Sequence, residues 1–153
     1  MMKSEANRRA QPKPLAVIAL MAGLVVLGVG ALGGGLQFIL DPTGESIGMS
    51  AELLAGSPFT DFLIPGLILF TVLGVYPLFV CYGLYKRRQW AWPAALSVGV
   101  ALIIWIVVQG AVIGFGHWLQ WLYLLFGIVI VLLVLLPSVR QTFGIDSLRS
   151  VRR

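Results

Sequence analysis

The chain has 153 residues, of which 59% are hydrophobic and only 11% are charged. A soluble domain usually carries about 25% charged residues, so this composition excludes an ordinary soluble protein. The net charge of +5 does not indicate nucleic-acid binding, because the basic residues flank long apolar segments. Membrane orientation and anionic lipid headgroups explain that placement better.

Four uncharged apolar segments are long enough to cross a bilayer as helices, which takes about 20 residues each. Strand-like alternation of polar and apolar residues is absent, and a backbone in lipid must satisfy its own hydrogen bonds. The sequence therefore predicts an all-α membrane protein, a bundle of four transmembrane helices. The predicted spans are about 15–40, 62–85, 90–114 and 118–136.

Short basic segments flank the predicted transmembrane domain. The domain covers 15–137, preceded by a basic arm over 1–14 and followed by a basic tail over 138–153. The remaining basic residues are Lys86-Arg87-Arg88, between the second and third spans. Basic loops stay in the cytoplasm, so we expect both termini and this turn on the cytoplasmic side. A cleaved signal peptide is the alternative for the first span, but its apolar run is too long for one.

Small residues on the first and third spans suggest close helix packing. Gly30 and Gly34 form a GxxxG pair, and Gly110 and Gly114 have the same spacing. Such pairs let helix backbones approach closely in lipid. Contacts within one bundle are the simpler interpretation, and a homo-oligomer interface is the alternative.

The second span contains two prolines and the only cysteine of the sequence. Pro65 and Pro77 each remove a backbone donor and should kink the helix, with Pro65-Gly66 as a candidate hinge. Cys81 cannot form an intramolecular disulfide, and we expect it to pack as a small apolar residue in the helix.

The loop between the first two spans holds four of the six acidic residues and no basic one. It should therefore lie outside the cell. Asp41-Pro42-Thr43-Gly44 fits a type I turn. Residues 49–55 predict a short amphipathic helix that ends at Gly56, and Ser57-Pro58 predicts the start of the second membrane helix.

These features together resemble a group of small four-pass bacterial integral membrane proteins that has no assigned function. The resemblance covers most of the chain, implies a bacterial inner (plasma) membrane and lends no activity. It rests on the glycine-rich first span, Asp41-Pro42-Thr43-Gly44, Ser57-Pro58-Phe59, Pro65-Gly66, and a last span with Trp118 and Pro137.

Six polar side chains fall at one depth, near the outer ends of the spans. One interpretation is a polar pocket open to the outside, with Asp61 and His117 as titratable members. The other, which we favour, is that these residues hydrogen-bond loop backbone, headgroups and water, as polar residues at span ends commonly do. The six are Gln37, Asp41, Asp61, Gln109, His117 and Gln120.

Catalytic and cofactor chemistry has little support in the sequence. No charge falls in the middle of a span, which disfavours a proton-coupled exporter. His117 is the only histidine and cannot supply paired haem ligands. No metal-ligand spacing, nucleotide-binding loop or Ser/His/Asp set is recognisable. We therefore expect no catalytic residue, no cofactor and no metal.

The function expected from these observations is structural or accessory. The protein would act through helix packing or its outer loop on a membrane-protein partner or on a second copy of itself. The alternative is a small oligomeric transporter or channel subunit whose mouth is the outward-facing polar pocket. An enzyme acting on a lipid-borne substrate ranks lowest.

Overall fold

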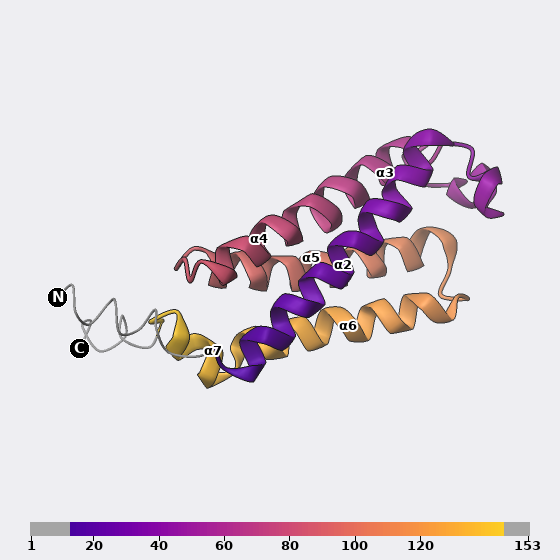
Figure 1. Cartoon of the computed structure of the whole chain (residues 1–153). Helices are drawn as coiled ribbons and strands as arrows, with labels where there is room; N and C mark the ends of the chain where they lie inside the picture. The colour runs from indigo at the N-terminus through magenta and orange to yellow at the C-terminus, as the bar shows by residue number, and fades with distance from the viewer. Residues whose placement is uncertain (1–12, 146–153) are drawn as a thin grey trace.

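The computed structural model describes residues 13–145, and these form an all-helical bundle without a strand. Four helices in it are long and apolar enough to cross a membrane (Figure 1). Each bound agrees with the predicted span within one residue. This confirms the four-helix bundle and a multi-pass membrane protein. The helices are Leu15–Leu40, Leu63–Tyr85, Ala91–Ile113 and Trp118–Leu135.

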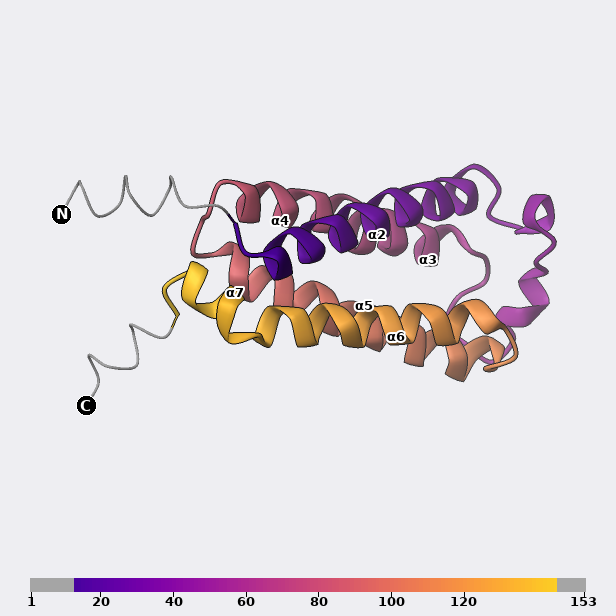
Figure 2. The same ribbon diagram turned by 60° about the horizontal axis from the view of Figure 1, so that its bottom comes forward.

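The helices pack as two hairpins, one of α2 with the second span and one of α5 with α6 (Figure 2). The second span consists of three consecutive segments, of which the middle one, η3, is a π-helix. A short helix, α7, follows α6. The elements are α2 (Leu15–Leu40), η1 (Glu45–Ile47), η2 (Ala51–Leu54), α3 (Leu63–Ile68), η3 (Leu69–Val75), α4 (Tyr76–Tyr85), α5 (Ala91–Ile113), α6 (Trp118–Leu135) and α7 (Pro137–Thr142).

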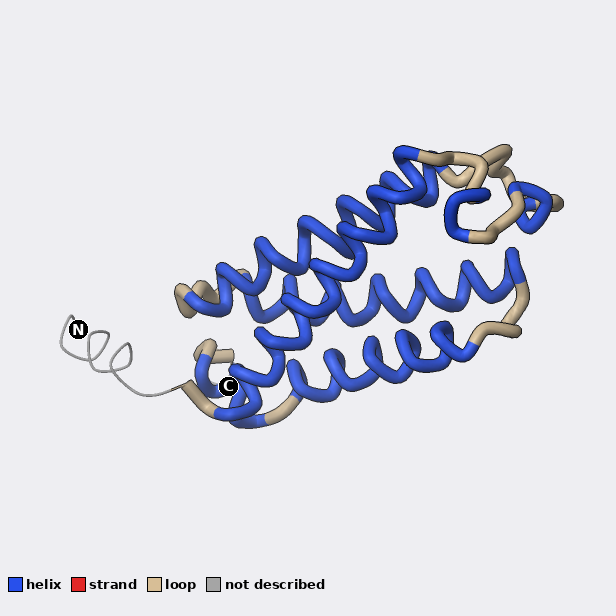
Figure 3. Tube along the Cα trace, turned by 45° about the vertical axis from the view of Figure 1, so that its right-hand side comes forward, coloured by secondary structure: helices blue, strands red, loops and turns tan. Residues whose placement is uncertain are grey.

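The two ends of the bundle differ in character. The start of α2, the α4–α5 turn and α7 lie together at one end, which we call the basic end (Figure 2). The 41–62 loop and the α5–α6 turn lie at the opposite end, which we call the loop end (Figure 3). At the basic end, the ammonium of Lys13 lies 4.1 Å from the centre of the Tyr85 ring, so the two helices of the first hairpin are tied together there.

Apolar side chains fill the half of the bundle nearest the basic end. Trp92 also donates its indole N–H to the carbonyl of Val134 at 3.0 Å, which joins α5 to α6. Cys81 is buried in α4, and its thiol donates to the Met21 carbonyl at 3.6 Å, so its predicted packing role is confirmed. The fully buried apolar residues of this half include Val17, Leu20, Leu24, Leu84, Ala95, Val98 and Val134.

The predicted basic tail begins as part of the bundle. Pro137 ends α6, as expected, but it also starts α7. Val139 and Phe143 are both buried in the main core, so the segment up to Ile145 belongs to the folded domain. Most of the predicted arm and the end of the predicted tail lie outside the described residues.

The two prolines of the second span have different surroundings, and the predicted kink at Pro77 stays a prediction. Helix α3 begins at Leu63, so Pro65 occupies its third position, where the amide has no intrahelical acceptor, and the predicted kink there is wrong. Before Pro77 the helix widens into a π turn, in which the amide of Tyr76 donates to the carbonyl of Thr71. A wider turn makes room for the proline ring, which would crowd a regular α-helix.

The closest helix crossings use glycines other than the four in the two GxxxG pairs. A Cβ at Gly35 would lie 2.6 Å from the Phe70 backbone nitrogen, and one at Gly66 would lie 2.6 Å from the Phe38 Cβ. Gly66 is therefore at a crossing of α2 and α3, and its role as a hinge stays a prediction. Between α5 and α6 the corresponding close positions are Gly99 and Gly127.

The four glycines of the motifs have looser surroundings or a different neighbour. A Cβ at Gly30 or Gly34 would make an ordinary contact of 3.5 Å, with the Tyr123 hydroxyl and the Leu69 side chain respectively. Gly110 lies against the ring of Phe115, within its own hairpin. Gly114 follows the end of α5 with φ of +84°, a conformation that favours glycine.

Candidate functional site

The 41–62 loop at the loop end is a folded structure. The amide of Gly44 donates to the Asp41 carbonyl at 3.1 Å, which closes the predicted turn. The Asp41 carboxylate accepts bonds from the Thr43 hydroxyl at 2.6 Å and the Ser46 amide at 2.8 Å. These bonds, first the one from Thr43 and then those from Ser46, lower the pKa of the Asp41 carboxyl to about 2. The amide of Phe62 donates to the Pro42 carbonyl at 2.9 Å, so the two ends of the loop are joined.

The middle of the loop differs in detail from the prediction. The predicted helix over 49–55 is a short 3₁₀-helix, η2, with Ser50 as its N-cap. Ser57 does not cap the second span. Its hydroxyl accepts the amide of Phe59 at 3.2 Å, and the chain stays irregular until Leu63. Phe62 holds the N-cap position of α3, and the Asp61 carboxylate just before it accepts the Leu63 amide at 2.9 Å.

Four of the six polar candidates have local hydrogen bonds at chain turns. Asp41 and Asp61 bond within the loop as described. The Gln120 side chain donates to the Gly114 carbonyl at 2.9 Å and accepts the His117 amide at 3.2 Å, so it closes the α5–α6 turn. Gln37 is exposed on α2. These contacts favour the interpretation that the polar residues satisfy the ends of the spans.

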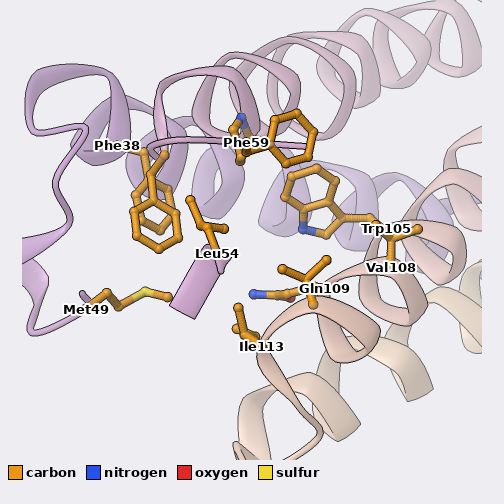
Figure 4. Close-up of a pocket in the computed structure, with 11 residues that line it drawn as sticks. Phe38, Met49, Leu54, Phe59, Trp105, Val108, Gln109 and Ile113 are labelled. Carbon is orange, nitrogen blue, oxygen red and sulfur yellow. The ribbon is translucent and has the colours of Figure 1, made fainter. Parts of the chain in front are cut away.

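Gln109 is the candidate that lines a cavity. The loop-end cavity is a small hollow with a volume of about 70 Å³, and it is partly open to the exterior. It lies between α5, the beginning of the second span, the end of α2 and the loop (Figure 4). The residues that line it are Phe38, Met49, Leu54, Phe59, Phe62, Pro65, Trp105, Val108, Gln109, Val112 and Ile113.

The wall of the loop-end cavity is apolar apart from two groups on α5. The Gln109 amide extends into the space toward Leu54, and the indole of Trp105 borders the same space (Figure 4). Neither side chain hydrogen-bonds to any residue in the range 13–145. Both groups are therefore available to a polar atom of a ligand.

Sequence reasoning selected Gln109 but not its neighbours. The lining brings Met49 and Leu54 of the loop against Trp105 of α5, residues about 50 positions apart in the chain. Each of these residues is individually typical of a core or a span, so no local signal marks them as one site. The apolar run at the end of α5 and the apolar side of η2 are the only hints.

The described part of the chain contains no group of three His, Cys, Asp or Glu side chains that could hold a metal ion. Comparison with known proteins gives no relative: no family model, no curated protein and no solved structure matches the chain. The function must therefore be inferred from the geometry of the bundle and its loop.

Proposed function

We propose that the protein is an accessory membrane protein that contacts a partner through the 41–62 loop. The observation that carries this proposal is the internal order of the loop, which is held by the Asp41 bonds and by the bond between Phe62 and Pro42. A loop that only connected two spans would not need this order. An ordered loop loses less conformational entropy when it binds.

The exposed side chains of the loop indicate what kind of partner surface would bind them. Ile47 and Leu53 are exposed apolar residues, and Glu45 and Glu52 are exposed acids that lie beside them. No basic residue occurs between positions 41 and 62. We infer that the partner offers an apolar surface with basic groups at its edge.

The orientation we propose places this loop outside a bacterial inner membrane and both termini in the cytoplasm. The bundle supports it, since Lys13, the Lys86-Arg87-Arg88 turn and Arg140 all lie at the basic end, while four acids lie at the loop end. Basic residues are retained on the cytoplasmic side during insertion.

The transporter alternative has less support. The half of the bundle nearest the basic end is filled by fully buried apolar side chains. A path for a polar solute would have to form between copies of the chain. A transporter that uses the polar layer should lose activity on Asp61→Asn or His117→Ala. The accessory function predicts that neither substitution changes partner binding.

The test is purification in mild detergent, with associated proteins identified by mass spectrometry. The variant Ile47→Ser/Leu53→Ser removes the exposed apolar groups. Its matched control, Ala55→Ser/Thr60→Ser, alters other exposed positions of the same loop. We expect one membrane or envelope protein to be retained by the wild type and the control and lost from the variant. Equal recovery with all three proteins would contradict the proposal.

A further inference from the structure

The loop-end cavity lies at the depth of one leaflet of the bilayer. Gln109 and Trp105 precede Ile113, the last residue of α5, by four and eight positions. At a helix rise of 1.5 Å per residue, they lie about 6 Å and 12 Å below the end of the helix. The hydrocarbon core is about 30 Å thick, so both side chains lie in the leaflet nearest the loop.

The cavity also reaches the surface that faces lipid. Val108 lines it and is 48% exposed. Ile104, one turn away on α5, is 57% exposed, so this face of the helix is directed toward lipid. On the opposite side, Leu54 and Phe62 are nearly fully buried and close the cavity toward the loop. A hydrocarbon chain can therefore enter sideways from the bilayer.

The lining matches an acyl chain joined to a polar linkage. Most of the wall is aliphatic or aromatic, which suits a hydrocarbon chain. The amide of Gln109 and the indole N–H of Trp105 have no partner among the described residues, and both are donors. A group left without a hydrogen bond in an apolar environment is costly, so an ester oxygen at this point would stabilise the complex.

The acidic residues of the loop determine which lipid headgroup charge the site tolerates. The loop above it contributes Asp41, Glu45, Glu52 and Asp61, with no basic residue to offset them. An anionic headgroup would be repelled there. We propose that the loop-end cavity binds part of one acyl chain of a zwitterionic glycerolipid from the surrounding bilayer, with the rest of that chain in the bilayer. An ester oxygen of that lipid accepts a hydrogen bond from Gln109 or Trp105. This goes beyond the proposed function, which concerns the exposed face of the loop.

Photolabelling shows directly where the acyl chain of the lipid lies on the protein. The protein is placed in nanodiscs of phosphatidylcholine that carry a photoactivatable diazirine on one acyl chain, and labelled residues are identified by mass spectrometry. The variant Val112→Trp fills the cavity, and Ile104→Trp adds the same side chain on the lipid-facing side of α5. We expect labels to concentrate on Met49, Phe59 and Ile113, to fall severalfold in Val112→Trp and to persist in Ile104→Trp.

Two results would overturn the proposal. One is labelling spread evenly over the exposed apolar residues of all four spans. The other is a cavity signal that Val112→Trp leaves unchanged although the variant folds.

Native mass spectrometry provides a second measurement, which does not depend on filling the cavity. Gln109→Leu keeps an apolar side chain of similar length and removes the amide. We expect the wild type to retain one phosphatidylcholine on release from nanodiscs and Gln109→Leu to retain severalfold less. Phosphatidylglycerol should be retained less than phosphatidylcholine. Equal retention of the two lipids, or equal retention by Gln109→Leu, would contradict the assigned ligand.

Discussion

Gly35 of α2 crosses the second span directly against the backbone of Phe70, where a Cβ would lie 2.6 Å from the nitrogen atom. A backbone atom cannot rotate away as a flexible side chain can. The first residue of the π-helix, Leu69, immediately precedes this contact. The crossing of the first hairpin therefore depends on the absence of a side chain at one position.

Gly35→Ala should destabilise the bundle. Overpacking at a tight contact costs about 1–3 kcal/mol, and here the two helix backbones must move apart. Gly33→Ala is the matched control, since a Cβ at Gly33 meets no atom within 4 Å. The measurement is thermal or chemical unfolding in detergent. Equal stability of the two variants would show that α2 and the second span separate more easily than the crossing implies.

Gln120→Leu should also be destabilising, for a different reason. Gln120 is 4% exposed and bonds to both Gly114 and His117, so its loss leaves a carbonyl and an amide of the α5–α6 turn without partners. We expect a cost of about 1–3 kcal/mol in the free energy of unfolding. Gln37→Leu is the control, because Gln37 is exposed and no hydrogen bond of its side chain is seen within the described residues. A similar loss of unfolding free energy in both variants would show that the cost comes from removing any polar side chain near the membrane surface, and not from the two hydrogen bonds of Gln120.

The order of the 41–62 loop should depend on pH through Asp41. The pKa of this carboxyl is lowered to about 2 in the folded loop, below its ordinary value of 3.8. A lowered pKa means that the ionised form is favoured by folding, so the stabilisation is present above pH 3.8 and is lost as the pH falls through about 2.

Nuclear magnetic resonance of the Thr43 and Ser46 amides would show this change directly. Both amides donate to the Asp41 carboxylate. We expect their resonances to shift with an apparent pKa near 2 and to lose this dependence in Asp41→Asn. A titration near the ordinary carboxyl value would show that these bonds are absent in solution.

The sequence predicts the four spans well because their pattern has one physical cause. Charged residues are excluded from hydrocarbon, so each span ends close to a polar or turn-forming residue, such as Asp41 or Lys86. The start of the second span is the least regular boundary. Ser57-Pro58 has the residue types of a helix start, but the chain remains irregular for five more residues. The helix begins at Leu63, whose amide donates to the Asp61 carboxylate.

Packing and the cavity could be predicted only in part, because they depend on which faces meet. Gly28, Gly35 and Gly66 look no different in sequence from Gly33, yet the first three lie at tight crossings and the last has open surroundings. From its position in the sequence, Gln109 is predicted to lie with the five other polar side chains near the outer ends of the spans. In the structure it lies in an apolar wall, because the loop folds Met49 and Leu54 over the end of α5.

The orientation of the bundle can be tested with cysteine substitutions at its two ends. Thr60 lies in the loop and Gln89 in the α4–α5 turn, and both are exposed. We expect a membrane-impermeant maleimide to label Thr60→Cys on intact cells and to label Gln89→Cys only after permeabilisation. Cys81 is buried, so it can remain in place as an internal background. Labelling of Gln89→Cys alone on intact cells would reverse the orientation, move the acidic loop into the cytoplasm and transfer the proposed partner to that side. Labelling of both positions would indicate a mixture of orientations, which the strong charge asymmetry of the two ends argues against.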